Sequence, residues 1–309
     1  MQGFGASDLK TFLSGRSPHF ESVVGDLVNS SECQKLLQLS KSITERVARI
    51  QSGTLSPTEL EELKGLNRQE GPALYQVGTA FIKKLYANAQ TVGDVGYLIN
   101  LYLQGVVPGT PCSIGPLSQE TDCIKNQLMT LNSMGMLTME SQPGTFPSRK
   151  DDEPNLTVLQ CPFLDVSIER SRINKLYSLI QAYNQGRNKS GSGRTSIVVS
   201  GSGKAIVTRV YMANDFETLE RYLHFKISGV HGDTVEIEGN WYFFPELPTN
   251  DTSHYSEKFS GALQGALAED MKTNRIQITI LSDDCFSPDR FMSDMCEIWK
   301  RVLDDNFNL

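Results

Sequence analysis

The sequence predicts an α+β protein, with mixed or antiparallel sheets flanked by helices and a small helical region in front of them. Two patterns carry this prediction. Apolar side chains recur at spacings of three and four through residues 1–90, which is typical of amphipathic helices. From Thr91 onward, helical stretches alternate with short runs rich in β-branched and aromatic residues, which are typical of strands. We therefore expect a helical N-terminal region, residues 1–90, and an α+β domain, residues 91–309.

The N-terminal region is predicted to form a small helical bundle. One apolar stripe follows helical spacing at Leu36, Leu39, Ile43, Val47 and Ile50. The segment Ser56-Pro57-Thr58-Glu59 has the cap, the first-turn proline and the capping-box glutamate of a helix start. Gly71-Pro72 is expected to break this helix before another apolar face begins at Leu74. We interpret these faces as core, and the alternative is a docking surface for a partner helix.

The elements after residue 90 are expected in a mixed order. Helices are predicted at residues 91–105, 122–135, 171–183, 215–223, 256–271 and 289–303. Strands are predicted from Leu137 and at residues 158–168, 195–199, 205–211, 225–230, 235–237, 241–245 and 276–281. A solvated loop is expected at residues 142–154, because this stretch holds three prolines and a run of charged residues.

Composition and charge argue against several classes of protein. The formal net charge is −7, whereas a protein that binds the nucleic-acid backbone needs a basic surface. No run approaches the roughly 18 apolar residues of a membrane-spanning helix, and residues 1–13 do not resemble a secretory signal. The six cysteines form no CxxC pair and there are four histidines, so we expect reduced thiols and no metal site. We therefore expect a cytoplasmic, reducing location and no nucleic-acid partner.

The most informative motif combines a helix start with the end of the next strand. Glu120 and Thr121 stand at the predicted helix start, and Gly135 ends that helix, because glycine suits a left-handed cap. Thr138 and Ser141 then lie toward the end of the following strand. A carboxylate and hydroxyls that converge at the ends of two elements suit a small-molecule site. The alternative is structural: a stabilised helix N-terminus and a tight turn.

The same stretch holds a recognisable order of short motifs. In chain order these are Pro116-Leu117, Glu120-Thr121, Leu131-Asn132, Gly135, Leu137-Thr138 and Ser141-Gln142-Pro143. With these motifs, residues 91–305 resemble the C-terminal regulatory domain of eukaryotic methylenetetrahydrofolate reductase, which senses S-adenosylmethionine. The resemblance implies the fold of that regulatory domain and a non-catalytic role.

The resemblance also implies a ligand, S-adenosylmethionine or S-adenosylhomocysteine. The motif residues that it assigns to the ligand are Glu120, Thr121, Thr138 and Ser141. Two further ligand threonines of the family correspond to Asn240, just before Trp241, and to Ser253 or Thr252. The assignment is chemically reasonable, because a carboxylate suits the ligand's positive charge and hydroxyls suit its ribose and carboxylate.

The reductase activity itself is not expected. Its catalytic barrel needs about 250 residues, and the helical region before Thr91 is too short for it, so no flavin or folate site is predicted. No nucleophile–base pair and no methyltransferase-type glycine loop can be placed, so we do not expect an enzyme. We expect a small-molecule sensor with a protein partner or as a homo-oligomer. The alternative is a structural or assembly subunit of a larger complex, which keeps the fold without the ligand.

Overall fold

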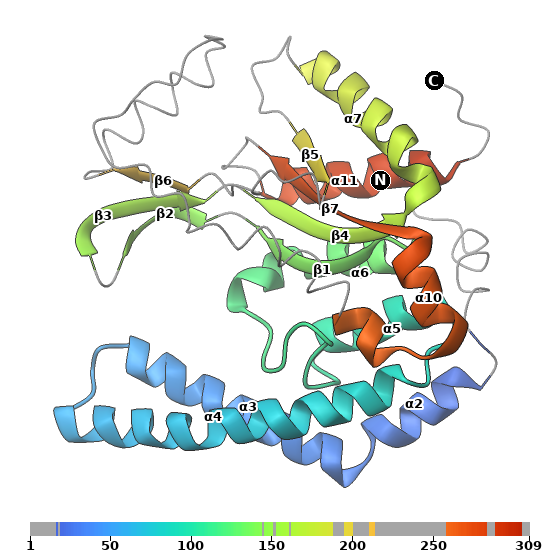
Figure 1. Cartoon of the computed structure of the whole chain (residues 1–309). Helices are drawn as coiled ribbons and strands as arrows, with labels where there is room; N and C mark the ends of the chain where they lie inside the picture. The colour runs from blue at the N-terminus through green and yellow to red at the C-terminus, as the bar shows by residue number, and fades with distance from the viewer. Residues whose placement is uncertain are drawn as a thin grey trace. The chain divides into compact units, whose positions relative to one another are not determined.

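The computed structural model describes residues 17, 19–143, 145–150, 153–160, 162–187, 195–199, 210–213, 258–282 and 288–304 (Figure 1). Its helices flank antiparallel sheets, which confirms the predicted α+β class. The chain divides into two compact units, residues 1–119 with 255–273 and residues 120–254 with 274–309. The elements predicted at residues 215–245 lie outside the described residues.

The described part of the first unit is helical. Its helices are α2 Phe20–Val28, α3 Ser31–Gln51, α4 Pro57–Tyr86, α5 Val92–Leu103 and α10 Gly265–Thr273, the last preceded by helical residues 258–262. Ser56 caps α4 as predicted, because its hydroxyl accepts from the Glu59 N–H while the Glu59 carboxylate accepts from the Ser56 N–H at 3.0 Å. The helix predicted across residues 256–271 is interrupted at residues 263–264, and Gly265, the first residue of α10, has a φ of +58° that a right-handed helix does not use.

Helix α4 is continuous through Gly71-Pro72, so the break predicted there is wrong. A proline inside a helix removes one hydrogen bond and crowds the carbonyl four residues earlier, at a cost of about 3 kcal/mol. Residues on both sides of it, Leu63, Leu74 and Phe81, nevertheless share one buried face. Burying side chains of this size contributes about 1.5–3 kcal/mol each, so packing along that face outweighs the local penalty.

The apolar stripe of α3 is only partly core. Leu36 is buried, Leu39, Ile43 and Ile50 are half-buried, and Val47 is 39% exposed. Helix α3 packs along α4, and Arg46 of α3 donates to the Asn67 amide oxygen of α4 at 2.7 Å. A seam between two helices leaves its flanks partly open, which explains why only part of the stripe is fully buried.

Helix α5 begins and ends as its sequence predicts. Thr91 caps it together with Asp94, whose fully buried carboxylate also accepts from the Ser17 hydroxyl at 2.7 Å. Gly105, with φ +73°, closes it. Because α5 belongs to the first unit, the two units do not coincide with the predicted regions 1–90 and 91–309. The division into a helical region, residues 1–90, and an α+β domain, residues 91–309, stays a prediction.

The described part of the second unit contains two antiparallel sheets. The four-stranded sheet has the order β1 Leu137–Gln142, β4 Phe163–Glu169, β7 Arg275–Ser282 and β5 Thr195–Val199. The three-stranded sheet has the order β2 Thr145–Lys150, β3 Glu153–Gln160 and β6 Val210–Ala213. Its helical segments are η1 Gln119–Cys123, α6 Lys125–Ser133, η2 Arg170–Arg172, α7 Ile173–Arg187 and α11 Pro288–Leu303.

The loop predicted at residues 142–154 is wrong, because β2 and β3 form a β-hairpin there. The residues typical of turns gather at the two ends of β2, as Pro143-Gly144 and Asp151-Asp152, and leave the strand between them able to pair. Pro147 is tolerated because β2 is an edge strand of the described sheet. Pro154 is tolerated because it lies next to the first residue of β3.

Most other elements of this unit agree with the sequence. The strands predicted at 195–199 and 276–281 correspond to β5 and β7, and the last predicted helix corresponds to α11. The strand predicted at 158–168 is instead two strands, β3 and β4, which are separated next to Pro162. The strand predicted at 205–211 is described only in its last part, within β6.

Helices cover one face of the four-stranded sheet. Leu164, Val166 and Ile168 alternate along β4 and are fully buried. Helix α11 contacts both α6 and α7, while α6 contacts β1 and α7 contacts β5 (Figure 1). This layer fixes α6 beside β1. The predicted ligand residues Thr138 and Ser141 lie in β1, and Glu120 and Thr121 lie in η1, directly before α6.

Candidate functional site

Glu120 and Thr121 lie in the short helix η1, directly before α6. Glu120 is exposed, and its carbonyl accepts from the Cys123 thiol at 3.2 Å. Thr121 is buried, and its carbonyl accepts from the Ile124 N–H at 3.1 Å. The N-cap residue of α6 is Ile124, whose side chain cannot accept a hydrogen bond. Neither Glu120 nor Thr121 is therefore the N-cap of α6.

The turn after α6 has the geometry that its glycine predicts. Gly135 has φ +79°, in the left-handed region. Its N–H donates to the Asn132 carbonyl and the Met136 N–H donates to the Leu131 carbonyl, each at 3.1 Å. This is the Schellman arrangement, which satisfies the last carbonyls of a helix and reverses the chain. The predicted left-handed cap at Gly135 is confirmed.

Thr138, the first hydroxyl residue after the turn, is held by Asn132 of α6. The Asn132 side-chain oxygen accepts from the Thr138 N–H at 2.7 Å, and the Asn132 amide nitrogen donates to the Thr138 hydroxyl at 2.9 Å. The hydroxyl also donates to the same side-chain oxygen at 3.1 Å. Both residues are buried, with 1% and 7% of their surface exposed. The end of α6 and the start of β1 are therefore joined by a closed set of hydrogen bonds.

A β-bulge in β1 decides which way Ser141 points. Thr138 pairs with Val166 and Ser141 with Leu164, although three steps along β1 then match two steps along β4. Residues three apart on a regular strand face opposite sides, whereas the irregularity between Thr138 and Glu140 returns Ser141 to the side of Thr138. That side is also the side of Leu164 and Val166, which α6 covers. Ser141 is half-buried there.

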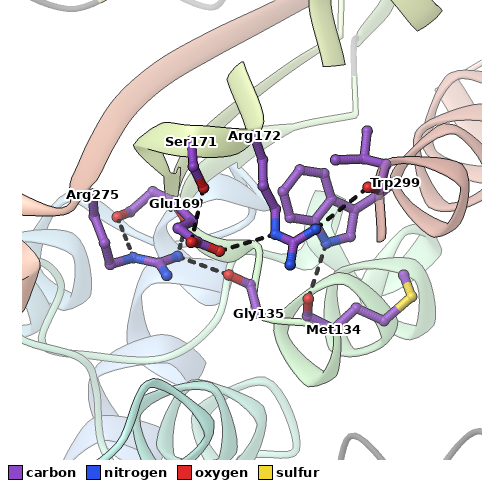
Figure 2. A network of polar contacts seen from close by, with 9 residues as sticks. Met134, Gly135, Glu169, Ser171, Arg172, Arg275 and Trp299 are labelled. Atoms are coloured by element: carbon purple, nitrogen blue, oxygen red, sulfur yellow. Dashed lines mark hydrogen bonds and ion pairs between the residues drawn. The ribbon is translucent and has the colours of Figure 1, made fainter. Parts of the chain in front are cut away.

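Two side chains from far along the chain hold the turn (Figure 2). The Trp299 indole N–H of α11 donates to the Met134 carbonyl at 3.0 Å. The Arg275 guanidinium of β7 donates to the Gly135 carbonyl at 2.7 Å and to the Ser167 hydroxyl at 3.1 Å. Donors and positive charge are favoured at the C-terminal end of a helix, where carbonyls lack partners. The turn is thereby attached to the sheet and to α11.

The same network continues on the surface of the unit. Ser171 and Arg172 both donate to the Glu169 carboxylate, at 2.8 and 2.9 Å, as Figure 2 shows. The Ser171 hydrogen bond, followed by the interaction with Arg172, lowers the pKa of Glu169 below its usual value of 4.5. Arg172 also donates to the Val302 carbonyl at 3.4 Å. These contacts stabilise η2 and the end of α11 around the buried turn.

The remaining predicted site residues cannot be placed beside this group. Asn240, Ser253 and Thr252 lie outside the described residues. The Cys123 side chain is exposed, yet partial desolvation of its thiol, followed by the charge of Asp289, raises its pKa. Among the described residues no group of three His, Cys, Asp or Glu side chains is arranged to hold a metal ion. No described helix has both the length and the apolar character needed to cross a bilayer.

Sequence reasoning assigned no contact to two residues: Asn132, which it named only within the Leu131-Asn132 motif, and Arg275, which it did not name. Asn132 lies at helical spacing from Leu128, so a polar side chain interrupts the apolar face of α6. That interruption was a usable signal for a buried polar contact. No local pattern marks Arg275, because its partner Gly135 is 140 residues away along the chain.

Two comparisons show similarity between this chain and known proteins. Residues 82–217 match a family described as a domain of unknown function, DUF6919, and this range includes Glu120, Thr121, Thr138 and Ser141. The chain is also 26% identical over 105 residues to methylenetetrahydrofolate reductase 1 of Schizosaccharomyces pombe. That match spans 32% of this chain but only 17% of the reductase. The predicted relation to a methylenetetrahydrofolate reductase is thus supported as similarity over a limited region.

Proposed function

We propose that this protein is a non-catalytic sensor that binds S-adenosylmethionine or S-adenosylhomocysteine between η1 and β1. The observation that carries the proposal is the β-bulge, which turns Thr138 and Ser141 to the side of the sheet where α6 lies. Without it, a spacing of three would direct the two hydroxyls to opposite faces. The limited similarity to the fission-yeast reductase supports the proposal that this is a regulatory-domain-like module.

The dimensions of α6 and β1 support a common site for the two halves of the motif. Helix α6 has nine residues, which correspond to a length of about 13 Å. The chain reverses at Gly135, and Ser141 lies about 7 Å beyond Thr138 along the sheet, because their partners Leu164 and Val166 are two residues apart on β4. Ser141 is thus displaced from the turn by about half the length of α6. Glu120, Thr121 and Ser141 would surround one end of the ligand, and Thr138 would contact it nearer the turn.

The chemistry of these groups fits the ligand class. The exposed Glu120 carboxylate suits the ammonium or sulfonium charge, while the hydroxyls of Thr121, Thr138 and Ser141 suit ribose and carboxylate groups. A sensor must bind its ligand more tightly in one conformation than in another. We propose that the ligand shifts the population presented to a protein partner or to a second copy of the chain, and that no reaction is catalysed.

The second candidate is a structural or assembly subunit that keeps the fold without the ligand. The contact between Thr138 and Asn132 favours it, because a buried hydroxyl that is already hydrogen-bonded has a sufficient structural role. Under this proposal, replacement of Glu120 and Ser141 leaves assembly into the complex unchanged.

Isothermal titration calorimetry with both metabolites tests the sensor proposal. We expect saturable binding at one site per chain. Glu120→Gln should weaken it about tenfold, since a hydrogen bond to a charged group contributes roughly 1.5 kcal/mol or more. Glu140→Gln is the matched control. Glu140 lies opposite Asp165 in the register of β1 and β4, so its side chain faces the other side of the sheet from Ser141. Absence of heat at millimolar ligand, with protein shown to be folded by circular dichroism, contradicts the proposal and favours the assembly subunit.

A further inference from the structure

We propose that an exposed stripe of helix α4 is the surface on which two copies of this chain pair, with their α4 helices antiparallel across a twofold axis at Ala73. The stripe consists of Glu62, Gln69, Ala73, Val77, Ala80 and Lys84. The inference is independent of the ligand proposed above, because α4 belongs to the first unit and the residues assigned to the ligand in η1 and β1 belong to the second.

The stripe lies on a side of α4 that the rest of the unit leaves open. Its members follow one another at steps of three, four or seven residues, so they share one side of the helix. All of them are exposed, and Val77 has 47% of its surface exposed. The buried side of α4, with Leu63, Leu74 and Phe81, lies at a different angle around the helix axis.

The middle of the stripe carries no charge. No charged residue lies between Glu70 and Lys83, although the outer side of a surface helix is usually polar or charged. Two of its members, Ala73 and Ala80, have small side chains that let another helix come close, and helices in direct contact have axes about 8–10 Å apart. An uncharged, exposed stripe of this kind suits contact with another helix.

The charges at the two ends of the stripe identify the partner as a second copy. Glu62 precedes Ala73 by eleven residues, and Lys84 follows it by eleven. A rise of about 1.5 Å per residue places both charges about 16 Å from Ala73 along the helix axis. When two α4 helices pair antiparallel with their Ala73 residues facing each other, Glu62 of each copy lies opposite Lys84 of the other. The stripe is therefore complementary to itself, as a twofold interface requires.

Both charged groups are available for this contact. Glu61 pairs with Lys64 and Arg68, whereas the neighbouring Glu62 carboxylate has no ion pair within the described residues. Lys84 lies 3.7 Å from the Glu32 carboxylate of α3, with 60% and 45% of the two side chains exposed. An exposed pair of this kind contributes little to stability, so Lys84 can turn to Glu62 of the second copy.

The size of the contact predicts a weak dimer. A length of about 33 Å from Glu62 to Lys84 and a helix width of about 10 Å give roughly 330 Å² on each copy. Stable complexes bury about 800 Å² per partner. The pair therefore belongs to the weak, reversible interfaces, and we expect a dissociation constant in the micromolar range.

Sedimentation equilibrium of the full chain across the micromolar range tests the inference. We expect the average mass to rise from that of the monomer toward that of the dimer. Glu62→Lys and Lys84→Glu each turn both end contacts into repulsions and should weaken dimerisation about tenfold or more. Arg68→Glu makes the same change of charge as Lys84→Glu at an exposed position on another side of α4, and should leave the dimer unchanged.

A mixture of the two single variants separates the contact from any effect on folding. The Glu62→Lys chain and the Lys84→Glu chain carry opposite charges at both ends of the stripe, so an equimolar mixture should form a heterodimer although neither variant pairs with itself. A wild-type chain that stays monomeric, a dimer that both variants retain, or a mixture that stays monomeric overturns the inference. Assembly beyond two copies also contradicts it, because a twofold contact closes at the dimer.

Discussion

The two ends of helix α6 differ in how far their polar groups are committed to the fold. At the C-terminal end, Asn132 binds Thr138, and the next carbonyls accept from Trp299 and Arg275. At the N-terminal end, the N-cap residue Ile124 offers no side-chain acceptor, and Glu120 is exposed. We propose that the C-terminal end holds the frame and that Glu120, exposed at the N-terminal end, contacts the ligand.

Replacement of Arg275 by alanine should have the largest effect on stability. The variant leaves the Gly135 and Ser167 carbonyls without this donor and removes a side chain from a residue that is only 7% exposed. We expect a loss of about 3 kcal/mol in the free energy of unfolding. Urea denaturation measures it, with Arg301→Ala, an exposed arginine of α11, as the control. If the two variants lost the same amount of unfolding free energy, Arg275 would not hold the turn at the C-terminal end of α6.

Asn132→Ala should come next. It leaves the Thr138 N–H and hydroxyl without their buried partner, so we expect a loss of about 2 kcal/mol in unfolding free energy. Asn126→Ala is the matched control, because Asn126 lies on the same helix and is exposed. If both alanine variants unfold at the same urea concentration, the buried contact contributes nothing.

The sequence predicts the local features of this unit and misses the features that depend on contacts far apart in the chain. The apolar face of α6 and the Gly135 cap were predicted because both depend on residues within one or two turns. The β2–β3 hairpin was missed, since its prolines and charges suggest a loop and only pairing with another strand decides otherwise. Arg275 was missed for the same reason, as a contact across 140 residues leaves no local pattern. The ligand chemistry of the site stays a prediction from the motif, whereas the contacts that hold the turn beside it come from the structure.

Glu169 should contribute little, and in a direction that pH reveals. Its pKa is lower in the folded chain than the usual 4.5, so its contribution to stability is present above that pH and is lost as the pH falls through the folded pKa. The side chain is 50% exposed, and solvent screening keeps the contribution below about 0.5 kcal/mol. Unfolding of wild-type and Glu169→Gln chains at pH 7 and pH 3 should differ only at pH 7. A difference that grows toward acid would contradict this assignment.

Glu120→Gln should change stability least of all. Glu120 is exposed and precedes α6, so we expect a shift below about 0.5 kcal/mol in unfolding free energy. The same variant should lose ligand affinity. Variants at the C-terminal end of α6, such as Asn132→Ala, should lose stability in addition. A large loss of stability in Glu120→Gln would make the N-terminal end part of the frame and remove the contrast between the two ends.

Hydrogen–deuterium exchange of the full chain, with and without millimolar S-adenosylmethionine, tests the central claim most directly. The claim is that the ligand contacts η1 and the end of β1, while the turn at Gly135 is already fixed. We predict slower exchange of amides in η1 and at Ser141 with ligand present, and unchanged exchange at the turn. Exchange that is unaltered in η1 and β1 at saturating ligand, or altered only elsewhere, would contradict it.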